Sequence, residues 1–475
     1  MNQIQLLIGG KDRDASDGAT FDRINPVTGE VATRAAAATL ADCDAACDAA
    51  AAAFPAWSST GPNERRKLLL KAADLLDARA PEFIGYGMAE AGSAPMWYGF
   101  NAMLAASMLR EAAAITTQIT GEVIPSDVPG LMAMGVRQAA GVVLGIAPWN
   151  APVILGVRAV ATPLACGNTV VLKASENCPA LHRLIGTVLN EAGLPPGVIN
   201  VITNAPKDAA AVVERLIAHP AVRRINFTGS THVGKVIAQH AAKHLKPALL
   251  ELGGKNPMVV LDDADLDEAV TAAAFGAFFN QGQICMSTDR IIVSRKIADE
   301  FVARLTAKVK TMRAGKPGEE GAVLAAMVSP EAAKRVAAMV EDALANAGRD
   351  AGSVVDHLHD DAGVLALGGD IHPAARRNRV EGVVDEVGPD LVEFAGEASD
   401  WGEVRFRFDG DGGAATGPAG RYRHWFTSRR SLDAGAGVAI AGGDAIRPGS
   451  VLGHVRYNPF PWLGVGVRPE QIRAT

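Results

Sequence analysis

Short apolar runs alternate with longer helical stretches between residues 142 and 228, and this alternation constrains the fold more than any other feature of the sequence. Such a pattern predicts a parallel β-sheet whose strands are joined by crossover helices, as in Rossmann-type α/β proteins. A sheet of this kind binds its ligands beyond the carboxyl ends of its strands. The expected strands are 142–147, 169–173, 198–203 and 224–228, and the expected helices are 153–165, 178–192 and 207–217.

Polar motifs follow three of these expected strands. Pro148-Trp-Asn150 follows the first strand, Lys173-Ala-Ser-Glu176 follows the second, and Gly229-Ser-Thr-His-Val-Gly234 follows the fourth. Because the carboxyl ends of parallel strands meet at one edge of a sheet, the three motifs predict one common ligand site.

The motif at 229–234 indicates a dinucleotide site, although no G-x-G-x-x-G fingerprint is present. A strand that turns into a helix can offer its N–H groups and the helix dipole to a pyrophosphate. A carboxylate after the second strand, Glu176, can accept both hydroxyls of an adenosine ribose and would repel a 2′-phosphate. We therefore expect NAD rather than NADP.

Cys285 is a candidate nucleophile and Glu251 a candidate general base. A carboxylate cannot lower the pKa of a thiol, because like charge raises it, so Glu251 suits the activation of a water that hydrolyses an acyl-enzyme. Attack on a carbonyl builds negative charge on oxygen, and the amide of Asn150 is a candidate donor to it. A single cysteine in an alanine-rich chain is also often a buried apolar residue, and that alternative remains open on the residues alone.

The motifs together resemble the aldehyde dehydrogenase superfamily. They are Pro-Trp-Asn at 148–150, Phe-Thr-Gly-Ser-Thr-His-Val-Gly at 227–234, Glu-Leu-Gly-Gly-Lys-Asn-Pro at 251–257 and Phe-Phe-Asn-Gln-Gly-Gln-Ile-Cys at 278–285. The resemblance extends from about residue 5 to about residue 347. Within the superfamily, segments 107–112, 121–127 and 134–137 are similar to the salicylaldehyde, vanillin and benzaldehyde dehydrogenases.

This resemblance implies a mechanism and a set of site residues. The Cys285 thiolate would add to an aldehyde, Asn150 and the Cys285 N–H would stabilise the oxyanion, hydride would pass to NAD, and Glu251 would activate water against the thioester. A CoA-acylating enzyme must keep water away from the thioester, so a general base that activates water, such as Glu251, argues against a relative of that kind. The residues implied in cofactor binding are Ile146, Pro148, Trp149, Lys173, Ser175, Glu176, Gly229, Ser230, Val233, Gly253 and Glu397.

The expected substrate is an aromatic aldehyde such as salicylaldehyde, benzaldehyde or vanillin. Trp97, Tyr98, Trp149 and Phe279 could form an aromatic slot, since flat rings suit aromatic ligands. Core or interface packing is the alternative for the aromatic residues near 97. Arg137 follows an expected interface hairpin at 120–134 and could approach the active site, with an ordinary ion pair as its alternative.

We expect an NAD-binding domain at 1–118 and 138–250, an α/β catalytic domain at 251–450, and an oligomerisation element at 119–137 and 451–475. A homodimer or homotetramer follows from the resemblance. Further expected elements are strands 5–10, 30–34 and 290–293 and helices 41–54, 96–117, 298–312 and 330–347, with another helix beginning near Pro62.

Composition limits the other classes of partner. The formal net charge is −6, so nothing suggests binding to nucleic acid or to an anionic membrane. There is no apolar run of 18 or more residues and no signal peptide at the first residues, and we expect a cytoplasmic protein. Cys43 and Cys47 lie four residues apart in a helix, but no further pair follows at zinc-site spacing, so no metal is expected.

The family pattern breaks down after about Ala347. Glu397 could be the counterpart of the glutamate that holds the nicotinamide ribose in the family, but the flanking motif is altered, and Asn458–Gly466 only hints at a later family motif. One hypothesis is that part of this segment is a frame-shifted translation of an ordinary family C-terminus, because a shifted reading of 411–428 resembles that terminus. A thiol esterase or a catalytically inactive scaffold remains as the alternative function.

Overall fold

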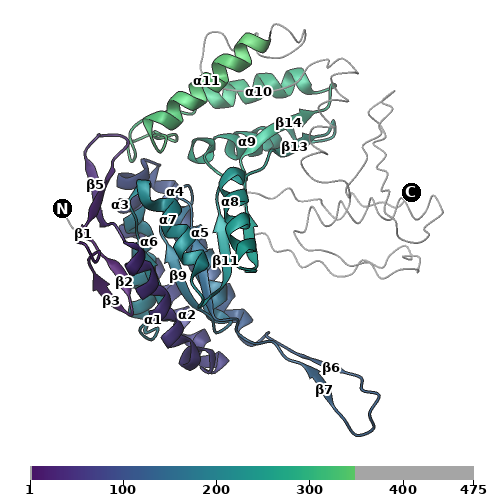
Figure 1. Ribbon diagram of the computed structural model, residues 1–475. Coiled ribbons are helices and arrows are strands. Elements are labelled where there is room, and N and C mark those ends of the chain that lie inside the picture. Colours follow the sequence, from purple (N-terminus) through teal and green to yellow (C-terminus); the bar gives the residue numbers. More distant parts are fainter. Residues whose placement is uncertain (1–2, 348–475) are drawn as a thin grey trace.

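The structure is a computed structural model that describes residues 3–347, and its centre is a seven-stranded sheet (Figure 1). The strand order is β12-β11-β8-β9-β10-β2-β3, in which the first five strands are parallel and β2 and β3 are antiparallel additions. The bounds of the strands are β2 Leu6–Ile8, β3 Lys11–Arg13, β8 Val142–Ile146, β9 Thr169–Lys173, β10 Ile199–Ile202, β11 Val222–Thr228 and β12 Ala248–Glu251. The parallel sheet expected from the sequence is confirmed.

The direction of the strand order reverses between β8 and β11. The chain runs from β8 outward through β9 to β10, and then returns to place β11 on the other side of β8. Such a switch point opens a crevice at the carboxyl ends of the two central strands. Asn150 follows β8 at this point, and Gly229 follows β11.

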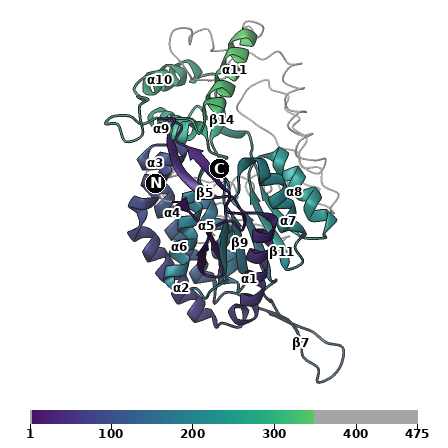
Figure 2. The ribbon, with the colours of Figure 1, turned by 60° about the vertical axis from the view of Figure 1, so that its left-hand side comes forward.

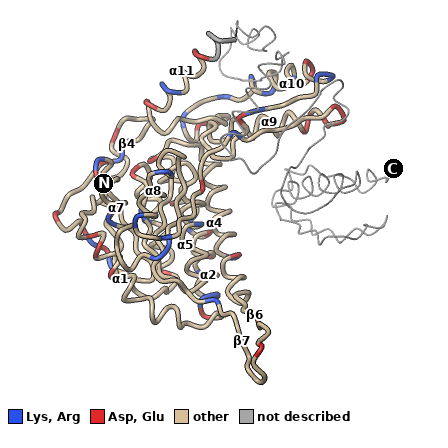
Figure 3. The backbone as a smooth tube through the Cα atoms, turned by 45° about the vertical axis from the view of Figure 1, so that its right-hand side comes forward, with Lys and Arg blue, Asp and Glu red and all other residues tan. Residues whose placement is uncertain are grey.

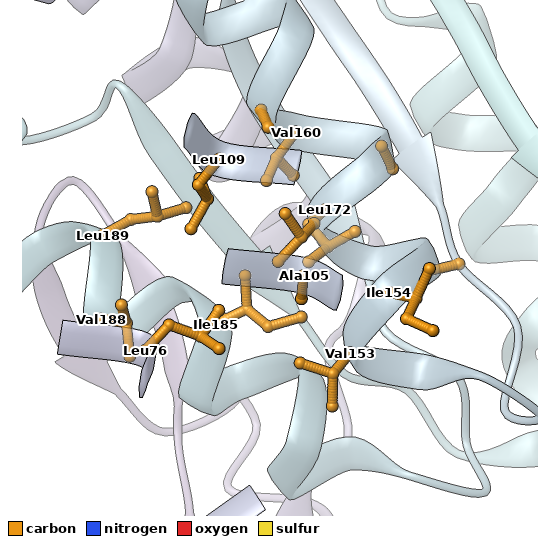
Figure 4. Packing of buried hydrophobic residues seen from close by; sticks show 14 of the residues in the cluster. Leu76, Ala105, Leu109, Val153, Ile154, Val160, Leu172, Ile185, Val188 and Leu189 are labelled. Carbon is orange, nitrogen blue, oxygen red and sulfur yellow. The ribbon is translucent and has the colours of Figure 1, made fainter. Parts of the chain in front are cut away.

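Helices cover both faces of the sheet because each strand sends alternate side chains to opposite sides. On one face Val143, Val170 and Leu172 belong to a core in which α5 and α6 pack on the sheet and α2 and α4 pack on those helices, as Figure 4 shows for Leu172 with its neighbours. On the other face Leu144 and Val171 pack against α1 and α7. The bounds of these helices are α1 Leu40–Ser58, α2 Pro62–Ala78, α4 Pro95–Ile115, α5 Pro152–Ala165, α6 Pro179–Ala192 and α7 Ala209–Ala218, with α3 Ala80–Ala91, α8 Thr231–Lys243 and the 3₁₀ turn η1 Pro206–Asp208 completing this part.

Helix α1 is longer than the sequence pattern predicts, since it continues through Pro55 to Ser58. Its start agrees with the expectation, because Thr39 and Asp42 form a capping box. The last turn is retained because Trp57 within it is buried in the core with 1% of its surface exposed.

A smaller unit lies beyond the carboxyl ends of the large sheet, at the top of Figures 1 and 2. It consists of the parallel pair β13 (Asn256–Val260) and β14 (Thr288–Val293), with α9 (Leu266–Phe278), the 3₁₀ turn η2 (Phe279–Gly282), α10 (Ala298–Lys310) and α11 (Pro330–Ala347). β12 ends at Glu251 in the large sheet and β13 begins at Asn256 in the small one, so the chain passes between the units within this short segment.

Arg23 connects the N-terminal strands to both units. Its guanidinium donates to the carbonyl of Glu90 (2.7 Å), to Oδ1 of Asn177 (3.0 Å) and to the carbonyl of Val328 (2.8 Å). Arg23 lies in a separate three-stranded sheet of β1 (Gln3–Ile4), β5 (Val31–Ala36) and β4 (Thr20–Ile24).

The hairpin of β6 (Glu122–Ile124) and β7 (Ala133–Gly135) projects away from the body of the protein, which confirms the expected hairpin (Figure 1). Most of its length is uncharged in Figure 3. Val123 and Met134 face each other across the hairpin and are 73% and 62% exposed, and Leu131 and Met132 near the tip are 60% and 70% exposed. A cluster of exposed apolar side chains is typical of an interaction surface.

Candidate active site

Asn150 lies in the loop that connects β8 to α5, at the switch point of the sheet. Its side-chain Oδ1 accepts a hydrogen bond from the backbone N–H of Ala151 (3.0 Å). Its backbone carbonyl accepts from Nε1 of Trp97 (2.9 Å) and from Nδ2 of Asn280 (3.2 Å). Because the side-chain oxygen is engaged, Nδ2 of Asn150 is oriented as a donor, and no acceptor for it lies among the described residues. An oxyanion requires such a donor.

Cys285 is half-buried in the loop between η2 and β14. The backbone before it is unusual, since Asn280, Gln281 and Gly282 have φ of +50°, +57° and +71°. Left-handed backbone at two non-glycine residues costs energy and persists only where surrounding contacts over-determine it.

Side chains of this loop supply those contacts. Gln283 accepts from the backbone N–H of Val328 (3.0 Å). The amide of Gln281, oriented to satisfy both neighbours, donates to the carbonyl of Ala326 (3.2 Å) and accepts from the N–H of Ala325 (2.8 Å). The loop that carries Cys285 is therefore held against the segment 325–328.

Glu251 is half-buried at the end of β12, where it pairs in register with Thr228 of β11. Five residues later, Nδ2 of Asn256 donates to the carbonyls of Cys285 (2.8 Å) and Ser287 (3.0 Å). The motif that begins with Glu251 thus also holds the backbone of the cysteine loop. Sequence reasoning quoted Asn256 as part of the motif but gave it no role.

Lys173 and Glu176 follow β9 and form an ion pair. Nδ2 of Asn204 also donates to Oε1 of Glu176 (3.0 Å), so both partners engage the same oxygen and neither engages Oε2. Burial by itself raises the pKa of Glu176, but Lys173 and the hydrogen bonds outweigh burial, and the pKa lies below its ordinary value. Glu176 is therefore a charged acceptor at neutral pH.

The turn into α8 has the form expected for an anion site. Oγ of Ser230 accepts from the N–H of Val233 (3.3 Å) and caps the helix, and the N–H of Gly229 donates to the carbonyl of Glu251 (3.0 Å). A Cβ at Gly229 would lie 2.4 Å from the ring of Phe227, so only glycine fits there. Ser230 and Val233 are exposed at the helix start, where N–H groups and the dipole favour negative charge.

His182 joins two of these loops, and sequence reasoning missed it because it lies in an apolar stretch of α6 with no partner nearby in the sequence. Its Nδ1 accepts from the N–H of Ser175 (3.0 Å) and its Nε2 donates to the carbonyl of Pro152 (3.1 Å). The imidazole is fully buried, and burial lowers its pKa to about 3. A neutral His182 therefore fixes the loop after β9 against the start of α5.

Arg158 is a second residue that sequence reasoning missed. It projects from α5, and its Nη2 donates to Oγ1 of Thr228 (2.9 Å), immediately before Gly229. Arg158 adds a half-buried positive charge to the crevice.

The aromatic residues differ in burial, since Trp97 and Tyr98 are 2% and 0% exposed, whereas Phe279 and Trp149 are half-buried. Trp97, Phe100 and Phe279 pack together, with the ring centroids of Trp97 and Phe279 4.9 Å apart in an edge-on arrangement. Trp149 is half-buried beside this core. Tyr98 is fully buried among core side chains, in contact with Gly87, so the structure places it in the core rather than in an open slot.

The remaining site residues lie as follows. Arg137 is exposed and precedes the amino end of β8, whereas Asn150 follows the carboxyl end, so the structure does not bring Arg137 to Asn150 within one chain. Ile146 and Ser175 are buried at the carboxyl edge, Pro148 is half-buried, and Gly253 is exposed between the two units. Glu397 lies outside the described residues. Within residues 3–347, no group of three or more metal-ligating side chains comes together, and no helix is long and apolar enough to cross a membrane.

The sequence profile described as "Aldehyde dehydrogenase family" matches residues 13–360. The chain belongs to this family. The match ends at residue 360, somewhat beyond the end near residue 347 that the sequence pattern predicts. Family membership makes the protein an aldehyde-oxidising enzyme and does not favour the thiol esterase or the inactive scaffold.

Named relatives support the same assignment. The chain is 65% identical over 349 residues to a vanillin dehydrogenase from Pseudomonas fluorescens, covering 74% of this chain and 72% of that one. It is 50% identical over 341 residues to a salicylaldehyde dehydrogenase from Pseudomonas sp. strain C18, covering 72% and 71%. The structure resembles a salicylaldehyde dehydrogenase from Pseudomonas putida G7 solved with salicylaldehyde, with a TM-score of 0.72, 46% identity and coverage of 78% of this chain and 75% of that one.

Proposed function

We propose that this aldehyde dehydrogenase uses NAD to oxidise an aromatic aldehyde to the carboxylic acid, with Cys285 as nucleophile, Asn150 as oxyanion donor and Glu251 as general base. The observation that carries the proposal is the link between the cysteine loop and the loop after β8, through Asn280 and the carbonyl of Asn150. It connects the nucleophile to the donor that its chemistry needs.

The roles follow from the chemistry of each side chain. The thiolate of Cys285 adds to the carbonyl carbon, while Nδ2 of Asn150 and the N–H of Cys285 donate to the developing oxyanion. Glu251 then takes a proton from a water that attacks the thioester carbon, and the acid leaves as the thiol is restored. NAD, when bound, supplies the hydride acceptor for the oxidation.

NAD fits the residues of this chain better than NADP. Oε1 of Glu176 is occupied by Lys173 and Asn204, which leaves Oε2 to accept from a ribose hydroxyl. The low pKa of Glu176 keeps it charged, and a charged carboxylate repels a 2′-phosphate. The start of α8 at Ser230 and Val233 suits the pyrophosphate. Ile146, Pro148, Trp149, Ser175 and Gly253 lie around the same edge and complete the proposed cofactor residues.

An aromatic substrate is supported by the relatives that act on vanillin and salicylaldehyde by name. The half-buried Trp149 and Phe279 are the proposed aromatic wall, supported by the buried Trp97, which contacts both Asn150 and Phe279. Rings in such a group contact a flat ligand by edge and face.

The proposed organisation follows the expected domains. We propose residues 1–118 and 138–250 as the cofactor domain, 251–450 as the catalytic domain, and 119–137 with 451–475 as the oligomerisation element, of which residues 348–475 lie outside the described residues. The exposed apolar hairpin supports a homodimer or homotetramer. A cytoplasmic location is part of the same proposal.

The test is formation of NADH from NAD and salicylaldehyde, run with the wild-type protein and with Cys285→Ala. Turnover by the wild type that is lost in Cys285→Ala would support the proposal. Turnover of an activated ester alone, with or without NAD, would favour a thiol esterase. A folded wild-type protein that binds NAD and oxidises no aldehyde would favour an inactive scaffold. A strong preference for short aliphatic aldehydes over benzaldehyde would exclude the aromatic substrate.

A further inference from the structure

Two side chains from different elements donate to one acceptor, the backbone carbonyl of Asn150. Trp97 reaches it from α4 and Asn280 from the turn η2 that leads to Cys285. We propose that Asn280 is a positioning residue that fixes the oxyanion donor Asn150 relative to the nucleophile loop, and that Trp97 holds the same carbonyl from the opposite element.

The conformation of Asn280 supports a specific role for its amide. The residue is 3% exposed and has φ of +50°, where glycine would meet no strain. Gly282, two residues later, shows that this loop contains glycine at such a position. Asparagine tolerates left-handed backbone better than most residues and also brings a donor, so its presence is accounted for by the hydrogen bond.

Asn280 forms hydrogen bonds both to Asn150 and to Gln283 of the cysteine loop. Its Nδ2 donates to the carbonyl of Asn150 (3.2 Å), and its own carbonyl accepts from the backbone N–H of Gln283 (3.0 Å) and from the side-chain Nε2 of Gln283 (3.2 Å). Gln283 lies two residues before Cys285. Through these bonds a shift of the cysteine loop would move Asn150, and a shift of Asn150 would move the cysteine loop. The Oδ1 of Asn280 is buried and has no hydrogen-bond partner within residues 3–347, so Nδ2 is the atom of the side chain that makes the link.

Trp97 supplies the second fixed point. Its ring packs edge-on against Phe279, one residue before Asn280, with centroids 4.9 Å apart. The indole thus contacts the nucleophile loop by packing and the oxyanion loop by its Nε1–H. Two donors on one carbonyl restrain its direction more than either donor alone.

The consequence for catalysis is geometric. An oxyanion donor is effective only when it is within hydrogen-bond distance of the oxygen that becomes charged, and a displacement of about 1 Å can cost about a hundredfold in rate. The inference therefore rests on the proposed roles of Asn150 and Cys285. It predicts a loss in kcat rather than in the binding of NAD, since neither Asn280 nor Trp97 contacts the loop of Glu176.

The variants separate the donor from the backbone conformation. Asn280→Asp keeps the size and the tolerance of positive φ but replaces the donor with an acceptor, and Asn280→Gly keeps the tolerance and removes the side chain. Both should lower kcat with salicylaldehyde by about tenfold to a hundredfold, with the dissociation constant of NAD unchanged. Trp97→Phe, which keeps a ring and removes the donor, should lower kcat by a smaller factor. Trp57→Phe is its matched control, because Nε1 of the buried Trp57 has no partner.

The deciding comparison uses Asn150→Ala as a second background. If Asn280 acts by positioning the amide of Asn150, Asn280→Gly should cost less than about twofold in kcat once that amide is absent. An equal loss in both backgrounds would show a merely structural role and overturn the inference. Should Asn280→Gly not fold, Trp97→Phe in the two backgrounds gives the same comparison.

The failure of the inference is distinguishable from failure of the proposed function. Cys285→Ala tests the function without changing Asn280. Full activity of Asn280→Gly beside an inactive Cys285→Ala would overturn only the inference. Absence of wild-type turnover would overturn the proposed function and, with it, the positioning role.

Discussion

The imidazole of His182 joins the loop after β9 to the start of α5, because its Nε2 donates to the carbonyl of Pro152 while its Nδ1 accepts from the N–H of Ser175. The first of these loops carries Glu176 and the second carries Asn150. The relative position of the proposed cofactor loop and the proposed oxyanion donor thus depends on one buried, neutral side chain. Protonation would remove the acceptor on Nδ1, and it is disfavoured because burial desolvates the charged imidazolium and the nearby Lys173 repels it, so both lower the pKa of His182.

Replacing His182 with Gln should change how stability depends on pH. The pKa of His182 is about 3 in the folded protein against an ordinary 6.5, so its contribution to stability is complete above 6.5 and is lost as the pH falls toward 3. At neutral pH, His182→Gln should be less stable by about 2 kcal/mol, from the loss of buried hydrogen bonds. The difference in free energy of unfolding between the wild type and His182→Gln, measured by urea unfolding, should become smaller as the pH is lowered from 6.5 to 4. The exposed His232 gives the control, His232→Gln, and a deficit of constant size would contradict the prediction.

Replacing Glu176 with Gln should weaken the preference for NAD over NADP. The neutral amide keeps the shape of the side chain but no longer repels a 2′-phosphate, and it loses the charge that pairs with Lys173. We expect the ratio of kcat/KM for the two cofactors to fall by about tenfold, since one charged hydrogen bond is worth about 1.5 kcal/mol. The exposed Glu64 on α2 provides the control, Glu64→Gln. An unchanged ratio would remove Glu176 from the cofactor site.

Alanine at two helical glycines should have opposite effects on stability. A Cβ at Gly156 of α5 would lie 2.5 Å from Ile185 and 3.0 Å from His182, so Gly156→Ala should destabilise by about 1–3 kcal/mol through overpacking. Gly85 of α3 has nothing within 4 Å of the added atom, so Gly85→Ala should stabilise by about 0.5–1 kcal/mol. Chemical unfolding of both variants gives the comparison. Similar effects of the same sign would mean that the contact between α5 and α6 is looser than described.

Charged residues on the hairpin should reduce self-association. Val123 and Met134 are opposite each other and largely exposed, so Val123→Lys with Met134→Lys places two charges on the apolar surface. We expect a smaller assembly by sedimentation velocity, with the secondary structure unchanged. Leu40→Lys, at an exposed apolar residue on the body of the protein, is the matched control. An assembly of unchanged size would place the interface elsewhere.

The large sheet was predictable because its evidence is local. Apolar periodicity over a few consecutive residues predicts both the strand at Thr169–Lys173 and the helix at Pro179–Ala192, and the structure confirms both. The position of Glu176 at the carboxyl edge follows from the strand before it. The substrate group was less predictable. Trp97 and Tyr98 are neighbours in sequence and both are buried, at 2% and 0% exposed, and only the tertiary structure shows that Trp97 donates to the carbonyl of Asn150.

The sequence alone therefore determined the fold class and the family, and it predicted Cys285, Glu251 and Asn150 as the catalytic residues, since each lies in a short motif or directly after a recognisable strand. Only the tertiary structure shows which residues hold the loops of this site. His182 links the loop of Glu176 to the start of α5, Asn280 links the cysteine loop to Asn150, and Arg23 links the N-terminal sheet to Asn177 and Val328. These bonds join separate segments of the chain, so no periodic pattern in the sequence predicts them. Folding brings such segments together through the burial of apolar surface, and the polar contacts among them become specific only once that packing is fixed.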